Sequence, residues 1–191
     1  MTAPLLALDE IACRRGERIL FKGLDLALHP GEAGLVTGPN GAGKSSLLRI
    51  VAGLLPPAAG RVTRNAAMAL AAEAPALDVR SPLARALLFW AEVDGRGRMQ
   101  VEDALTTMGL ERLADVPVRL LSTGQRRRAT IARVIAGGAP IWLLDEPGSG
   151  LDVASLEALA AAMAQHRAGG GVVLAASHQP LGLTQACEIA L

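Results

Sequence analysis

The segment Gly38–Ser45 constrains the fold of this chain more than any other. It reads GPNGAGKS, which fits the pattern GxxxxGK[ST], and it lies between a short apolar strand predicted at 33–37 and an amphipathic helix predicted at about 44–54. Glycines let successive main-chain N–H groups point at one phosphate, and the helix N-terminus adds partial positive charge. The pattern therefore predicts a nucleotide-binding loop, with a glycine-rich helix cap as the less specific alternative. The residues predicted to bind the nucleotide are Gly38, Pro39, Asn40, Gly41, Ala42, Gly43, Lys44, Ser45 and Ser46.

The last residues of this loop carry its side-chain chemistry. Lys44 is expected to reach the β- and γ-phosphates, and the Ser45 hydroxyl is expected to bind Mg²⁺. Of the 19 basic residues in the chain, only Lys22 and Lys44 are lysines. A lysine kept at this place in an arginine-rich chain agrees with a chemical requirement for it.

Composition restricts the class of protein further. The 191 residues suffice for one substantial domain, and 51% hydrophobic against 19% charged residues excludes intrinsic disorder. The formal net charge of +1 provides no basic field, so no nucleic-acid partner is expected. No apolar run reaches the length of about 18 residues that a membrane-spanning helix needs. Cys13 and Cys187 lack metal-site spacing, which favours a reduced chain over a disulfide scaffold.

A second motif ends an apolar strand predicted at 141–145. The strand finishes in Asp145 and is followed by Glu146. The first acid after such a strand usually holds Mg²⁺, directly or through water, and the second is placed to polarise a water that attacks the γ-phosphate. Because carboxyl ends of parallel strands meet at one edge of a sheet, we expect both acids to lie near the phosphate loop.

Hydrophobic periodicity elsewhere predicts an α/β fold. Segments 5–12 and 17–28 alternate apolar and polar residues, as paired antiparallel strands do. From about 75 to 136 the period becomes helical, and a helix and a buried strand alternate again afterwards. The other predicted strands lie near 61–64, 67–72 and 172–176, and the other predicted helices are 82–92, 98–109, 123–137 and 153–167.

The segment Leu121–Gln125 reads LSTGQ and lies 20 residues before Asp145. A serine and a glycine at a helix start offer a hydroxyl and N–H groups to an anion, although alone they indicate only a helix cap. The order of the motifs is more specific. The phosphate loop, LSTGQ, LLDEP, the SGLD run at 149–152 and Ser177-His178 follow the order and spacing of the nucleotide-binding subunit of ABC transporters, which the chain resembles over essentially its whole length.

The resemblance implies a particular domain organisation. We expect a single ABC ATPase domain over 1–191, of the α/β P-loop NTPase class, with an N-terminal antiparallel β-subdomain. Its P-loop core is expected to comprise 1–74 and 137–191, interrupted by a helical subdomain at 75–136.

The resemblance also implies an ATP hydrolase with ATP and Mg²⁺ as ligands. Lys44, Glu146 and His178 are the expected catalytic residues, and Ser45 and Asp145 the expected Mg²⁺ ligands. His178 follows the apolar strand at 172–176, where the family has a histidine that contacts the γ-phosphate; alone it would be read as a surface histidine.

The same resemblance implies which proteins the chain binds. Two copies are expected to form a homodimer, with the loop 149–152 linking the two sites. Separate integral membrane subunits are expected to dock on the helical subdomain, so that the chain is peripheral on the cytoplasmic face of the inner membrane. The residues expected to close over the γ-phosphate of the other copy are Ser122, Gly124 and Gln125.

Narrower features resemble one subfamily, the ATPase subunits of haem exporters used in cytochrome c maturation. These are the HQPL run at 178–181, Trp142 in the acidic strand, and Leu88-Phe89-Trp90 in the helical subdomain. Haem-handling membrane proteins are the partners that this resemblance implies. Phe89 and Trp90 are interpreted as helix packing rather than as a haem contact.

Two other functions share the main motifs. The chain could be the ATPase of a different ABC transporter, which a co-purifying membrane subunit would identify. It could also be a nucleotide-sensing module with weak hydrolysis, although the residues for hydrolysis are present. An ABC ATPase acting on ribosomes or DNA is disfavoured, because such proteins normally join two cassettes or insert a long coiled coil.

The chain departs from the family pattern at a few positions. Ala74, preceded by Glu73, occupies the place of a usual glutamine, which bears on coupling to the membrane partner. Arg15 occupies the place of an aromatic residue that stacks on adenine; its guanidinium plane could stack on a base, or it is an exposed turn arginine. Thr123 replaces a glycine of the signature, and Gly148 replaces a threonine after Pro147. Arg126–Arg128 either favour phosphate electrostatically or form a solvated basic face.

Overall fold

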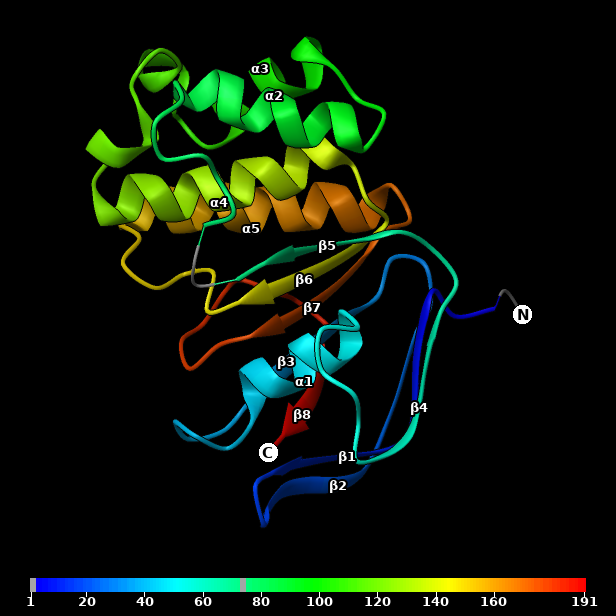
Figure 1. The fold of residues 1–191 in the computed structure, drawn as a ribbon. Helices are drawn as coiled ribbons and strands as arrows, with labels where there is room; N and C mark the ends of the chain where they lie inside the picture. The colour runs from blue at the N-terminus through cyan, green and yellow to red at the C-terminus, as the bar shows by residue number, and fades with distance from the viewer. Residues whose placement is uncertain (1–2, 73–74) are drawn as a thin grey trace.

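The computed structural model describes residues 3–72 and 75–191, which form two sheets and a layer of helices (Figure 1). The first sheet is antiparallel, with the strand order β2-β1-β4. The second is parallel, with the order β5-β6-β7-β3-β8. The strands are β1 (Leu6–Arg15), β2 (Arg18–Leu28), β3 (Ala33–Thr37), β4 (Ala59–Arg64), β5 (Met68–Ala71), β6 (Ile141–Asp145), β7 (Val172–Ala176) and β8 (Cys187–Ala190).

The helices cover both faces of the parallel sheet. One helix, α1, lies between the two sheets, whereas α4 and α5 lie on the opposite face and carry α2 and α3 as an outer layer (Figure 1). Their bounds are α1 (Lys44–Val51), α2 (Leu83–Val93), α3 (Arg98–Thr107), α4 (Thr123–Gly137) and α5 (Val153–Ala168), with short 3-10 turns η1 (Glu111–Leu113) and η2 (Val118–Leu120). Within the described ranges, no helix combines the length and apolarity that crossing a bilayer requires.

Alternate residues of β6 join two separate hydrophobic clusters. Ile141 and Leu143 pack with α1 and the antiparallel sheet, whereas Trp142 and Leu144 pack with the helical layer. This two-residue alternation is the period of a β-strand, and burial on both faces explains why the strand is apolar throughout. β6 is thereby held from both sides, which fixes where its carboxyl end lies.

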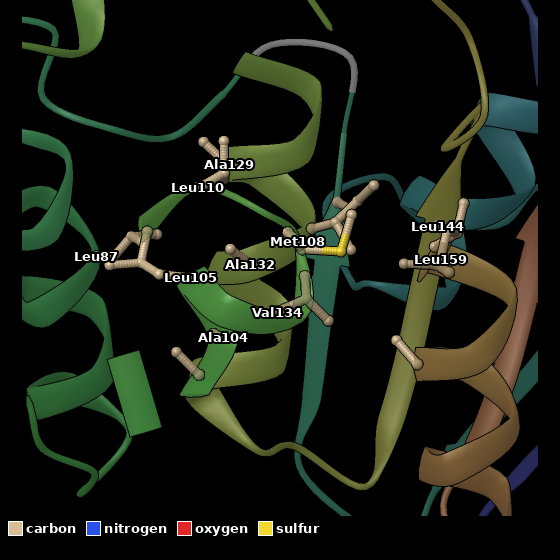
Figure 2. Packing of buried hydrophobic residues seen from close by; sticks show 14 of the residues in the cluster. Leu87, Ala104, Leu105, Met108, Leu110, Ala129, Ala132, Val134, Leu144 and Leu159 are labelled. Carbon is tan, nitrogen blue, oxygen red and sulfur yellow. The ribbon is translucent and has the colours of Figure 1, made fainter. Parts of the chain in front are cut away.

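The larger cluster continues outward through the helical layer (Figure 2). Leu87 of α2 and Leu105 of α3 point toward one another between the helices, and Leu144 of β6 and Leu159 of α5 lie at the other end of the same cluster. The helical block between β5 and β6 therefore shares its core with the parallel sheet.

The predicted α/β class with an antiparallel N-terminal sheet is confirmed, with differences at the ends of elements. The first helix ends at Val51 rather than near 54, because Gly53 adopts a left-handed conformation with φ 76°. The strand predicted near 61–64 begins earlier, at Ala59, and pairs with β1. β8 was not predicted, because a four-residue, largely exposed edge strand has too little hydrophobic pattern.

His166, to which the sequence assigned no role, packs in the last turn of α5. Its ring stacks on Trp142 with centroids 3.9 Å apart and an interplanar angle of 11°. Its Nε2 donates a hydrogen bond to the carbonyl of Pro140 at 3.1 Å, which ties α5 to the start of β6. Burial lowers the pKa of His166 below 6.5, and the hydrogen bonds oppose this only in part.

The fold should therefore lose stability in mild acid through His166. Because the folded pKa lies below the unfolded one, the unfolded chain binds the proton first as pH falls through about 6.5. We expect His166→Phe, which keeps the stack, to flatten the fall in unfolding free energy between about pH 7.5 and pH 5, at a cost of about 1 kcal/mol near pH 8 for the lost hydrogen bond. Urea unfolding followed by tryptophan fluorescence measures both effects, and an unchanged pH slope in the variant would contradict the assignment.

Candidate active site

The phosphate loop depends on glycines with positive φ. Gly38, Gly41 and Gly43 have φ angles of 139°, 84° and 116°. A Cβ at Gly38 would lie 2.6 Å from the carbonyl oxygen of Leu191, and one at Gly43 would lie 3.0 Å from the ring of Phe21. Conformation and space thus both require glycine at the two ends of the loop. α1 begins directly after it, at Lys44.

Lys44 folds back over the loop that it follows. Its Nζ donates hydrogen bonds to the carbonyls of Gly38 at 2.8 Å and Pro39 at 3.4 Å, and lies 3.7 Å from Glu146 Oε1. Only 7% of its side chain is exposed. A buried ammonium group needs such partners to offset its desolvation, and a phosphate oxygen would be a stronger partner than the carbonyls.

Ser45 and Asp145 join α1 to the end of β6. Ser45 Oγ donates a hydrogen bond to Asp145 Oδ1 at 2.9 Å. Burial raises the pKa of Asp145, the hydrogen bond from Ser45 opposes the shift, and the nearby Glu146 adds to it. A hydroxyl and a carboxylate are hard oxygen ligands, and Mg²⁺ is typically held by one or two such groups together with phosphates. This donor set fits Mg²⁺.

Glu146 and His178 face one another across the ends of β6 and β7. Glu146 has φ 47°, uncommon for a side chain of this size, and its N–H donates to the carbonyl of Ala176 at 2.8 Å. Its Oε2 lies 2.7 Å from His178 Nδ1 and accepts a longer bond from the His178 N–H at 3.4 Å. The three predicted catalytic residues therefore lie together, with Lys44 and His178 on the two oxygens of the Glu146 carboxylate.

A pocket of about 370 Å³ opens over the phosphate loop. Arg15 lines it and is exposed at the end of β1, a place that agrees with either interpretation of this residue, base stacking or an exposed arginine. Arg49 lines it too, and its charge opposes the rise in the pKa of Asp145. The sequence analysis missed Arg49, although it follows Ser45 by one helical turn and so lies on the same side of α1. The other lining residues are Leu20, Asn40, Gly41, Gly43, Lys44, Ser45, Ser46 and Glu146.

The structure does not bring the LSTGQ residues to this pocket of the same chain. Ser122 caps α4: its Oγ accepts from the N–H of Gln125 at 3.3 Å, and Gln125 Oε1 accepts from the N–H of Ser122 at 2.8 Å. Gly124 packs on the loop after β6, where an added Cβ would lie 3.0 Å from the carbonyl of Gly150. None of these three residues lines the pocket over the phosphate loop.

The interpretation of Arg126–Arg128 as a solvated basic face is wrong for two of the three. Arg127 Nη1 donates to the carbonyls of Ala72 and Asp145, at 3.4 and 3.3 Å, and Arg128 Nη1 donates to the carbonyl of Met108 at 3.0 Å. Both tie α4 to other elements. Glu73 and Ala74, at the usual glutamine position, lie outside the described residues.

Comparison with known proteins defines the class. A family model described as ABC transporter matches residues 21–149, and the chain belongs to this family. It is an ABC transporter ATPase, which binds ATP and works with membrane subunits.

Sequence relatives indicate which kind of ABC transporter ATPase the chain is most similar to among those compared. The chain is 58% identical over 187 residues to the cytochrome c biogenesis ATP-binding export protein CcmA of Sphingopyxis alaskensis, covering 98% of this chain and 96% of that protein. It is 53% identical over 186 residues to the protein of the same name from Novosphingobium aromaticivorans, covering 97% and 95%.

Solved structures agree on the fold. The ATP-binding subunit of an ABC transporter matches with a TM-score of 0.88 and 23% identity, over 98% of this chain and 85% of that one. A dimeric ATP-binding cassette in a post-hydrolysis state, bound to ADP and Pi, matches with a TM-score of 0.86 and 24% identity, over 97% and 94%.

Asp145→Asn tests the burial of the carboxyl at the end of β6. Burial raises the pKa of the Asp145 carboxyl in the folded chain above its value in the unfolded chain. Ionisation of this carboxyl therefore lowers the free energy of unfolding as pH rises from the unfolded pKa to the folded pKa. We expect the variant without nucleotide to be at least as stable as wild type near pH 7, and this advantage to vanish below about pH 4. Chemical unfolding at several pH values measures it, with Asp103→Asn on the exposed face of α3 as the control. A variant less stable by the same amount at every pH would contradict the burial argument.

Proposed function

We propose that this chain is the ATP-hydrolysing subunit of the haem exporter of cytochrome c biogenesis, and that it couples hydrolysis to haem delivery through separate membrane subunits. The observation that carries the hydrolytic part is the convergence of Lys44, Glu146 and His178 beside the Ser45–Asp145 pair. The transport pathway rests on the relatives, which are cytochrome c biogenesis export proteins at 58% and 53% identity.

In this proposal the loop Gly38–Ser46 binds the phosphates of ATP, and Arg15 stacks on the base at the other side of the pocket. Lys44 exchanges its carbonyl partners for β- and γ-phosphate oxygens. Ser45 and Asp145 hold Mg²⁺, which when bound neutralises charge on the phosphoryl oxygens. Asp145 is suited to this role because a cation offsets the desolvation of its carboxylate.

Hydrolysis proceeds by in-line attack of water on the γ-phosphate, which breaks the bond between the γ-phosphorus and the bridging oxygen and releases ADP and inorganic phosphate. Glu146 accepts the proton of this water, and His178 contacts the γ-phosphate. In the resting site the two oxygens of Glu146 face Lys44 Nζ and His178 Nδ1. A γ-phosphate attracts both of these groups, so its arrival frees the Glu146 carboxylate for the water. Lys44 and the loop N–H groups stabilise the charge that develops on the phosphate.

The complete site requires a second copy of the chain. Ser122, Gly124 and Gln125 do not line the pocket over the phosphate loop of their own chain, yet they offer a hydroxyl and main-chain donors at the N-terminus of α4. In a head-to-tail homodimer these residues reach the γ-phosphate of the other copy. The loop Ser149–Asp152, which packs against Gly124, then links the two sites.

The membrane subunits dock on the helical block at the cytoplasmic face of the inner membrane. A pocket of about 480 Å³ opens there between α2 and the segment 75–78, and Phe89, which lines it, is 61% exposed. The interpretation of Phe89 as helix packing is therefore wrong, whereas Trp90 does pack against the core. Trp90 lines the same pocket, and its Nε1 donates to the carbonyl of Ala76. Phe89 packs edge-on against Trp90 at 5.5 Å, so this aromatic pair offers an apolar contact to a helix of the partner.

Glu146→Gln tests the hydrolytic proposal. Removing the proton acceptor while keeping the side-chain volume should lower kcat for phosphate release about 100-fold or more, with ATP binding retained. The control is Glu157→Gln, an exposed glutamate of α5. Phosphate release that persisted at the wild-type rate in Glu146→Gln would overturn the catalytic role.

The transport proposal needs a test in the host. Deletion of the gene should abolish covalently bound haem in membrane proteins separated by electrophoresis and stained for haem peroxidase activity. Wild type and Glu157→Gln should restore it, and Glu146→Gln should not. Haem staining that survived the deletion would overturn the cytochrome c pathway and leave the ATPase assignment intact.

A further inference from the structure

Gln179, the residue after His178, inserts its side chain into space left by Gly148. A Cβ built at Gly148 would lie only 2.3 Å from Gln179 Nε2, and 3.0 and 3.1 Å from methyl groups of Leu156 and Leu181. Gly148 lies outside the left-handed region, so room for Gln179, not main-chain freedom, requires glycine here. Gly148, a departure from the family pattern, and Gln179, part of the HQPL run, are therefore the two halves of one contact.

This contact joins the two loops that carry the Glu146–His178 pair. Gly148 follows Glu146 by two positions in a turn where the N–H of Ser149 donates to the carbonyl of Glu146 at 3.1 Å. On the other loop, Ser177 Oγ donates to the carbonyl of Gln179 at 2.8 Å and accepts from its N–H at 3.1 Å. Any shift of Gln179 therefore moves the main chain at His178, whose Nδ1 is 2.7 Å from Glu146.

The side-chain N–H donor of Gln179 is unsatisfied within the described part of the chain. Gln179 Nε2 is buried and has no hydrogen-bond partner among the residues that the structure describes. A buried donor without an acceptor is less favourable than an apolar group of the same shape, such as methionine. Volume alone therefore does not account for a glutamine at this place.

We propose that Gln179 is a positioning residue for hydrolysis. Its amide fills the space over Gly148 and, when nucleotide binds, donates a hydrogen bond to a main-chain carbonyl of the turn at 146–151. This bond sets the geometry of Glu146 relative to His178. The proposal rests on the hydrolytic roles proposed above for these two residues. The resting state carries the cost of the unpaired donor, and the nucleotide-bound state gains the hydrogen bond.

The first test replaces the amide and keeps the volume. We expect Gln179→Met to lower kcat for ATP hydrolysis about ten-fold with little change in KM, because misplacement of a reacting group lowers the rate without weakening substrate binding. Its melting temperature without nucleotide should equal or exceed that of wild type. Gln165→Met, at an exposed position of α5, is the matched control. Wild-type kcat in Gln179→Met, or a kcat loss that merely follows a lower melting temperature, would overturn the proposal.

The second test uses the contact itself. Gly148→Ala should expel the flexible amide and lower kcat to a similar extent, about ten-fold. In a Gln179→Ala background the added methyl group meets only the flexible ends of Leu156 and Leu181, at 3.0 and 3.1 Å. Gly148→Ala should therefore cause a much smaller further loss there than in wild type. Additive losses in the double variant would show that the two residues act independently, and would overturn the proposal.

Glu146→Gln and His178→Ala separate this inference from the proposed function. If both abolish hydrolysis and Gln179→Met does not slow it, only the positioning role of Gln179 fails. If neither Glu146→Gln nor His178→Ala slows hydrolysis, the proposed catalytic site fails, and the positioning role, which depends on that site, fails with it.

Discussion

The hydrogen bond from Ser45 Oγ to Asp145 Oδ1, at 2.9 Å, joins residues 100 positions apart, and the site depends on it. It holds the start of α1 against the end of β6, and the neighbouring residues make a second connection, in which Lys44 Nζ lies 3.7 Å from Glu146 Oε1. Both contacts exist because β3, β7 and β6 are neighbouring parallel strands, so their carboxyl ends reach one edge of the sheet. The strand order thus brings together a phosphate loop, two acids and a histidine that are remote in sequence.

Packing on both faces of the sheet keeps that edge in register. Side chains of β6 alternate between the cluster around α1 and the cluster of the helical layer, so the strand cannot slide without exposing one set or the other. Arginines of α4 add polar ties: Arg127 donates to carbonyls at the ends of β5 and β6, and Arg133 donates to the carbonyl of Leu70. The helix that begins at the LSTGQ segment is therefore tied directly to the strand that ends in Asp145.

Sequence patterns predicted the parts of the molecule in which local chemistry and global fold agree. The phosphate loop, the strand Ile141–Asp145 and the helix after Ser122 each combine a period with a boundary signal, and all three lie where predicted. Contacts between distant segments left no such local signal. Arg49 enters the pocket only because α1 faces it, and the place of β4 beside β1 depends on the whole sheet.

The residues that break local rules lie at this same edge. Glu146 holds a left-handed main-chain conformation, Lys44 buries its ammonium group, and Gln179 buries an amide donor that finds no acceptor within 3–72 and 75–191. Each of these is unfavourable for folding, and each lies beyond the carboxyl end of a well-buried strand, β3, β6 or β7, that holds its segment in place. The phosphates of a nucleotide would offset the charge of the Lys44 ammonium group. They would also rearrange the hydrogen bonds around Glu146 and Gln179. These features lie where the proposed function places the phosphates, so a ligand at this edge would change the partners of all three groups.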